Sequence, residues 1–130
     1  MTPEDAPTEA LFDVYHALRA SRRRYVIQIL LESDDEVLMV RTLARQIAAI
    51  EEDIPPDHAT GEPYRNVYNS LSQTHLATLS DADIIVYNPD RQTVATGTNF
   101  KTAILIVVLN RSIYQILHEE TLPDMDDLQL

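Results

Sequence analysis

The sequence predicts a mainly α-helical fold with one small β-hairpin, an α+β arrangement within a single domain. Three observations predict this class. Apolar residues recur at helical spacing in several segments, two short β-branched segments flank a turn at 88–92, and a long apolar helix follows them. A chain of 130 residues with 45% hydrophobic residues is long enough to bury one core.

The charge of the chain is strongly acidic. The formal net charge is −11, and Lys101 is the only lysine. By itself this charge argues against a nucleic-acid partner, because phosphates favour a basic face. However, acid-rich and lysine-poor composition is typical of proteins from a very salty cytoplasm, where carboxylates keep the surface hydrated. We therefore expect a halophilic source, and we interpret the charge as an adaptation to solvent.

The chain has no cysteine, which excludes disulfides, thiolate metal sites and thiol-based redox sensing. It has neither a signal-peptide pattern nor an uninterrupted run of 18 apolar residues. We therefore expect a cytoplasmic protein with no membrane partner.

The N-terminal third is expected to contain a flexible tail and two helices. Residues 1–7 form the tail, and Thr8 caps a first helix that ends near Arg19 and has an apolar face of Leu11, Val14, Tyr15 and Leu18. A second helix extends from 21 to 32, with Arg22, Arg23 and Arg24 in its first turn. Because cations there oppose the helix dipole, the cluster either contacts phosphate or forms salt bridges on a solvated face.

A short strand is predicted at 37–40 and a third helix at 41–52. Leu43 and Ile47 can pack inward, whereas Arg41, Thr42 and Arg45 face outward. Helices with this pattern lie across the DNA backbone in helix-turn-helix proteins.

The fourth helix is predicted from Pro63 to Leu79, with Glu62 as its cap. At 100° per residue, one arc contains Val67, Tyr68, Leu71, His75, Thr78 and Leu79, with Leu76 at its edge. The opposite arc has no carboxylate and consists of Arg65 at its boundary and Asn66, Asn69, Ser70, Gln73 and Thr74. Asn and Gln can bind adenine bidentately, and Arg can bind guanine. The alternative is an ordinary polar helix face.

Two strands are predicted at 84–87 and 93–96, with Arg91 at the tip of the turn between them. A wing arginine contacts phosphate or enters the minor groove, and the alternative is a loop arginine paired with Asp90. A polar-faced helix followed directly by a hairpin is the order of the DNA-binding half of a winged helix-turn-helix.

The last helix, capped by Thr98 or Asn99, is predicted from Phe100 to Glu119 and is apolar all round. Such a helix must be buried all round, which favours a dimer in which one side packs on Leu11, Val14 and Leu18. The alternative to a dimer is a monomer in which this helix is wholly internal. Residues 120–130 are expected to form an acidic tail. The predicted organisation is a DNA-binding domain at 8–97 and a dimerisation helix at 98–119, with dimer contacts from Phe100, Ile104, Leu105, Val107, Val108, Ile113, Ile116 and Leu117.

The segment at 73–87, QTHLATLSDADIIVY, resembles the recognition-helix-to-wing signature of winged helix-turn-helix regulators in the arsenic-repressor-like (ArsR) and phenolic-acid-repressor-like (PadR) groups. The span 11–96 resembles the small acidic winged-helix proteins of haloarchaea, and the appended helix resembles that of oxidative-stress regulators. Asp83 stands where glycine is usual, and Asp tolerates the left-handed backbone needed there. The resemblance implies an archaeal DNA-binding transcription regulator that responds to stress.

The predicted partner is double-stranded DNA with a pseudo-palindromic site, read by a homodimer whose two recognition helices lie about 34 Å apart. Inorganic cations held by carboxylates are expected at the interface. The predicted DNA-binding residues are Arg22, Arg23, Arg41, Thr42, Arg45, Tyr64, Arg65, Asn66, Asn69, Ser70, Gln73, Thr74, Arg91 and Gln92.

The alternative function is a winged-helix protein-interaction module without DNA binding. We do not expect an enzyme or a cofactor, because the sequence lacks a nucleophile–base pair, and Gly61 and Gly97 are its only glycines. We expect His75 to be a buried, hydrogen-bonded structural histidine, since no pair of histidines has metal-ligand spacing.

Overall fold

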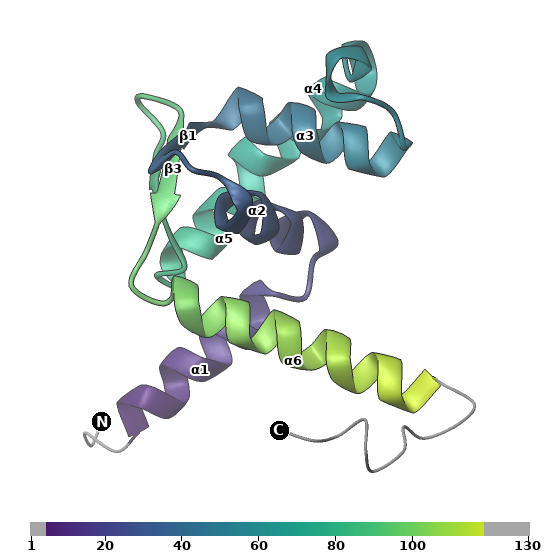
Figure 1. Ribbon diagram of the computed structural model, residues 1–130. Coiled ribbons are helices and arrows are strands. Elements are labelled where there is room, and N and C mark those ends of the chain that lie inside the picture. The colour runs from purple at the N-terminus through teal and green to yellow at the C-terminus, as the bar shows by residue number, and fades with distance from the viewer. Residues whose placement is uncertain (1–4, 119–130) are drawn as a thin grey trace.

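The computed structural model describes residues 5–118 of the chain, and the side chains of 9–118. Its elements confirm the mainly helical α+β class (Figure 1). The helices α2, α3 and α4 with its continuation surround the core, and α1 and α6 lie beneath them in this view. In chain order the elements are α1 (Asp5–Ala17), α2 (Ser21–Glu32), β1 (Val37–Met39), α3 (Val40–Glu52), the 3-10 turn η1 (Pro56–His58), α4 (Gly61–Ser70), the π-helical turn η2 (Leu71–His75), α5 (Leu76–Asp81), β2 (Ile85–Asn88), β3 (Thr93–Thr96) and α6 (Phe100–His118).

The sheet has three antiparallel strands in the order β1-β3-β2. The predicted hairpin is present, with Ile85 opposite Thr96, although its first strand runs from Ile85 to Asn88, one residue later than predicted. The strand β1 extends the hairpin by pairing Val37 with Ala95. The strand β1 is one residue shorter than predicted, because Val40 starts α3 and its N–H donates to the Gln92 carbonyl at 2.9 Å. The sheet therefore joins the start of α3 to the hairpin turn.

Two further helix starts, besides that of α3, were predicted wrongly. The first helix begins at Asp5 rather than Thr8, so residues 5–7 of the predicted tail are helical, while 1–4 and 119–130 lie outside the described residues. The fourth helix begins at Gly61, not at Pro63, and Thr60 is the residue before it. Gly61 has a φ of 70°, a left-handed value that favours glycine.

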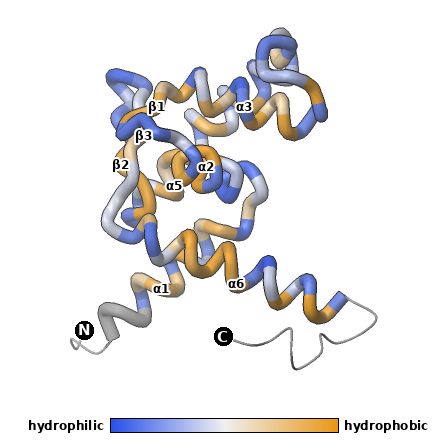
Figure 2. Tube along the Cα trace, viewed as in Figure 1, coloured by the Kyte–Doolittle hydropathy of each residue, from blue (hydrophilic) through white to orange (hydrophobic). Residues whose placement is uncertain are grey.

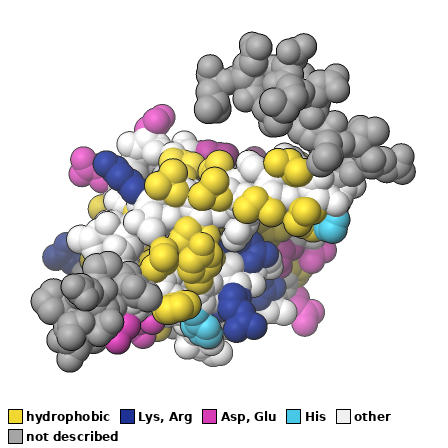
Figure 3. Space-filling view, turned by 90° about the horizontal axis from the view of Figure 1, so that it is seen from below, with side chains coloured by type: hydrophobic (Ala, Val, Ile, Leu, Met, Phe, Trp, Pro, Cys, Tyr) yellow, Lys and Arg dark blue, Asp and Glu magenta, His cyan; other side chains and the backbone are white. Residues whose placement is uncertain are grey.

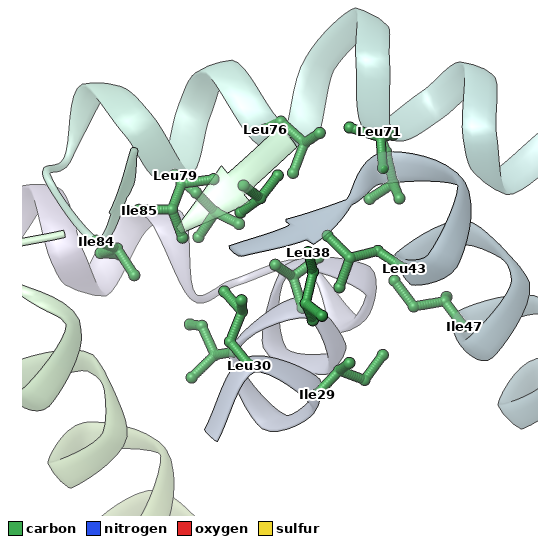
Figure 4. Packing of buried hydrophobic residues seen from close by; sticks show 14 of the residues in the cluster. Ile29, Leu30, Leu38, Leu43, Ile47, Leu71, Leu76, Leu79, Ile84 and Ile85 are labelled. Carbon is green, nitrogen blue, oxygen red and sulfur yellow. The ribbon is translucent and has the colours of Figure 1, made fainter. Parts of the chain in front are cut away.

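The core is built from apolar side chains of α2, α3, the α4–η2–α5 segment and the sheet (Figure 4). Leu71 and Leu76 are both 0% exposed although they are five residues apart. The reason is the π turn, in which the Leu76 N–H donates to the Leu71 carbonyl and one extra residue enters the turn. The predicted arc, with His75 inside and Leu76 at its edge, was therefore wrong: His75 is half-buried.

The junction between α5 and α6 is closely packed. Asp83 has a φ of 58°, which confirms the predicted left-handed conformation, and its carbonyl accepts from the Asn99 N–H at 2.7 Å. A Cβ on Gly97 would lie 2.5 Å from the same carbonyl oxygen, so glycine is required there. The Asn99 side chain donates to the Ala82 carbonyl at 3.0 Å, which adds a second hydrogen bond across this junction.

The helix α6 packs on its own domain only at its start. Phe100, Ala103 and Ile106 are buried, so the prediction of Phe100 as a dimer contact was wrong. Every residue from Val108 to His118 is exposed, which rules out a wholly internal helix in this single chain. Figure 2 shows α6 extending beyond the domain, and Figure 3 shows hydrophobic side chains gathered on this underside.

By length and composition alone, α6 would also be able to cross a membrane. It has 19 residues and a window with mean hydropathy 1.3, of which 17% is buried.

Candidate nucleic-acid interface

The predicted reading face lies on the outer surface of α4 and η2. We call it the polar strip, and it consists of Arg65, Asn66, Asn69, Ser70, Gln73 and Thr74. All of these side chains are exposed except Ser70, which is half-buried. Together with Glu62, all but Thr74 line a surface hollow of about 590 Å³. The strip therefore offers amide, hydroxyl and guanidinium groups to a partner at the surface.

Carboxylates lie closer to this strip than the sequence indicated. Glu62 shares the hollow with the strip, one turn before Asn66 on α4. Glu51, near the end of α3, accepts hydrogen bonds from the same arginine that contacts Asn66 and Ser70. The strip itself has no acid, but two carboxylates flank it.

Arg22 connects three helices instead of remaining free for phosphate. Its Nε donates to Glu51 Oε2 at 2.7 Å and its Nη2 donates to Glu51 Oε1 at 2.9 Å. This hydrogen bond and the charge of Glu51 raise the pKa of Arg22. Its Nη1 donates to Ser70 Oγ at 2.8 Å and to Asn66 Oδ1 at 3.4 Å. The predicted phosphate contact by Arg22 is thus replaced by a salt bridge.

The other two arginines of this cluster also face the protein. Arg24 donates to the Leu18 carbonyl at 2.6 Å and so closes the turn between α1 and α2. Arg23 is half-buried, and burial followed by the charge of Arg19 lowers its pKa. Its Nε is buried without a hydrogen-bond partner among the described residues. Neither side chain is presented as the exposed phosphate ligand that the sequence suggested.

His75 lies in the π turn with its Nδ1 buried. Among residues 9–118 this nitrogen has no hydrogen-bond partner, and neither has the buried Ser72 Oγ of the same turn. Burial, followed by the charges of Arg23 and Arg22, lowers the pKa of His75. The predicted hydrogen bond of His75 is therefore absent at Nδ1 among the described residues. The described residues hold no cluster of three or more metal-ligand side chains.

A second group of predicted residues lies on α3. Arg41 and Arg45 are exposed and Thr42 is half-buried, and with Gln46 and Pro56 they line a hollow of about 360 Å³. The Arg45 guanidinium lies 6.0 Å from the centroid of the half-buried Tyr64 ring. The centroids of the Tyr64 and Tyr68 rings are also 6.0 Å apart. Stacking of this kind orients Arg45 without neutralising its charge.

The hairpin turn, which we call the wing, is tied to α4 by Gln92. The Gln92 Oε1 accepts from the Tyr68 hydroxyl at 2.7 Å, and its Nε2 donates to the Pro89 carbonyl at 2.8 Å and the Tyr87 hydroxyl at 3.2 Å. The side chain of Gln92, predicted as a DNA contact, is therefore committed to positioning the wing.

Arg91 is exposed at the tip of the wing, where its N–H donates to Asn88 Oδ1 at 3.1 Å. The pairing of Arg91 with Asp90 is absent, because the only ion pair among the described side chains joins Arg22 to Glu51. Arg41, Arg45, Arg65 and Arg91 therefore carry charge without an ion-pair partner in this part of the chain.

Sequence reasoning missed two residues that organise this surface, Glu51 and Tyr68. Both act on residues 24 or more positions away, Tyr68 on Gln92 and Glu51 on Arg22. No local pattern indicates such contacts, since they depend on which faces of the helices meet.

In a comparison with known protein families, one family matches the part of the chain that carries this surface. A family model described as a domain of unknown function (DUF7344) matches residues 15–95, from α1 through β3. No curated protein and no solved structure matches the chain. Because the model covers more than half of its length, the chain belongs to the family named domain of unknown function DUF7344.

Proposed function

We propose that this protein is a sequence-specific, homodimeric regulator of transcription that binds double-stranded DNA through a winged helix-turn-helix. The observation that carries the proposal is the exposed, acid-free polar strip on the helical segment before the hairpin. The order α2, β1, α3, α4–η2–α5, β2 and β3, with β1 paired to β3, supports it. This is the order of helices and strands expected for a winged helix-turn-helix, with α3 as the backbone-crossing helix.

In this proposal the polar strip enters the major groove. Asn66, Asn69, Gln73 and Arg65 read base edges, because amides and guanidinium groups match the donor and acceptor patterns there. Arg41, Thr42 and Arg45 on α3 and Arg91 on the wing hold phosphates, which set the register of the protein on the duplex. The unpaired charge of the three arginines supports this role.

The exposed apolar residues of α6 support a second copy of the chain as its partner. A symmetric dimer buries the same surface on both subunits and presents two strips to a pseudo-palindromic site. A membrane fits α6 less well, because Asn110, Arg111 and Gln115 lie within the span. A charged residue at the centre of a membrane helix costs about 2.5–3.5 kcal/mol.

The negative charge of the chain favours formation of the DNA complex in concentrated salt, where cations screen the repulsion between carboxylates and phosphates. Glu62 and Glu51 flank the strip, so phosphates would approach carboxylates as well as arginines. Cations retained between these groups would weaken the usual loss of affinity with rising salt, which comes from counterion release.

The test is selection of bound duplexes from genomic fragments, followed by anisotropy titrations from about 0.1 to about 3 M KCl. Gln73→Ala should weaken binding to the selected site by about 1–3 kcal/mol and relax the preference at one base pair. Gln28→Ala, which alters an exposed glutamine on α2, is the matched control. Unchanged affinity and preference would remove Gln73 from the reading residues.

Absence of selective binding at every salt concentration would favour the alternative, a protein-interaction module. The observation behind this alternative is the exposed apolar surface, which includes Phe12 on α1 at 67% exposure and Leu117 on α6 at 73%. An interaction module would retain self-association or partner binding through this surface while showing no preference among duplexes.

A further inference from the structure

The contact between Arg22 and Asn66 fixes the orientation of an amide that faces the proposed groove. Arg22 Nη1 lies 3.4 Å from Asn66 Oδ1 and 2.8 Å from Ser70 Oγ. A guanidinium group has only donors, so the amide atom that faces it must be the oxygen. The two N–H bonds of the Asn66 amide are then directed away from Arg22, on a side chain that lines the surface hollow.

The hydroxyl of Ser70, one turn further along the helix, also forms hydrogen bonds within the protein. Ser70 Oγ accepts from Arg22 and donates its hydrogen to the Val67 carbonyl at 3.2 Å. A hydroxyl has one hydrogen and two lone pairs, so Ser70 has no donor left for a base. This part of the strip therefore offers hydrogens only from the Asn66 amide.

Arg22 itself is held by both carboxylate oxygens of Glu51. The two hydrogen bonds of 2.7 and 2.9 Å form a bidentate pair, and both side chains are only about one-quarter exposed. Bidentate pairs of this kind are geometrically specific, because two parallel bonds fix the plane of the guanidinium group. Glu51 thus determines where Arg22 Nη1 lies relative to Asn66.

We propose that Arg22 is a positioning residue that sets the base preference at the place read by Asn66. This inference rests on the proposed function. An Asn binds adenine bidentately when its oxygen and an N–H both face the base, whereas Asn66 directs its oxygen toward Arg22 and its N–H bonds outward, so it needs acceptors on the base. Guanine presents two acceptors in the major groove, O6 and N7, whereas cytosine presents a donor there. The base pair facing Asn66 is therefore read as guanine, and adenine is not favoured.

The experiment is selection from a randomised duplex library with the full-length protein in molar KCl. Asn66→Ala first identifies the base pair concerned, as the position at which preference disappears. Arg22→Met then frees the Asn66 oxygen, and preference at that position should move from guanine to adenine by roughly five-fold or more. Lys101→Met is the matched control, because it also removes one positive charge but lies on the first turn of α6, well separated from α4 in Figure 1.

A purely structural role of Arg22 would lower affinity for all duplexes without changing the preferred base. Unchanged preference in Arg22→Met, with its fold verified by circular dichroism, would overturn the proposal while leaving DNA binding intact. Where Arg22→Met does not fold, Glu51→Ala releases the guanidinium group and should shift the preference in the same direction by a smaller factor. Failure of the wild-type chain to select any duplex would overturn the proposed function and this inference together.

Discussion

Replacing exposed apolar residues in the second half of α6 should dissociate the proposed dimer. Leu109 and Ile113 lie one helical turn apart and are 58% and 52% exposed. Full burial of such a side chain contributes about 1.5–3 kcal/mol, so burying the exposed half contributes about 1 kcal/mol. A symmetric interface contains each residue twice, which gives about 2 kcal/mol, or roughly a 30-fold change in Kd, for Ile113→Ser alone.

The assay is sedimentation equilibrium in molar KCl over a range of protein concentrations. The double variant Leu109→Ser with Ile113→Ser should weaken association by roughly 1,000-fold if the two effects add. Val86→Ser is the control, because Val86 on β2 is 59% exposed and loses a similar apolar area away from α6. A wild-type chain that is monomeric at all concentrations, or a double variant with unchanged mass, would refute this reasoning.

Three further predictions concern the α4–η2–α5 segment and its junction with α6. Because burial lowers the pKa of His75, the unfolded chain binds a proton there more strongly, so stability should fall as pH drops below about 6.5. In His75→Gln the melting temperature should fall less as the pH drops. If the melting temperatures of the variant and the wild type depend on pH identically, His75 is not the group responsible. Leu76→Ala should reduce the free energy of unfolding by about 2–5 kcal/mol, whereas Ala77→Ser, at an exposed position, should change it little. Equal effects in denaturant titrations would argue against the π turn. Gly97→Ala should destabilise the fold, since its Cβ would lie 2.5 Å from the Asp83 carbonyl oxygen, and an unchanged melting temperature would show that the junction can relax.

Local patterns were sufficient for the order and type of the α-helices and strands, but they did not indicate the 3-10 turn η1 or the π turn η2. The β-branched segments around the turn at 88–92 formed the predicted hairpin, and Asp83 adopted the predicted left-handed backbone. The acid-free face of α4 and η2 lies at the surface as the 3.6-residue period indicated. These features depend on backbone preferences and on the alternation of apolar and polar residues, both of which are properties of short segments.

The same patterns were insufficient where the helical period changed or where distant segments met. A five-residue interval between Leu71 and Leu76 places both in the core only if a π turn intervenes, and a wheel of 100° per residue cannot show this. Phe100 was predicted at an interface because its helix is apolar all round, but packing against its own domain buries it.

The amino-acid sequence by itself determined which segments are helices and strands and which helix carries an acid-free face. Only the tertiary structure decided which polar groups on that face remain free. Arg22 bonds to Glu51 and to Asn66, and Gln92 bonds to Tyr68, because folding brings helices from distant parts of the chain within hydrogen-bonding distance. A polar residue can serve a partner only with the donors and acceptors that its own fold leaves unused.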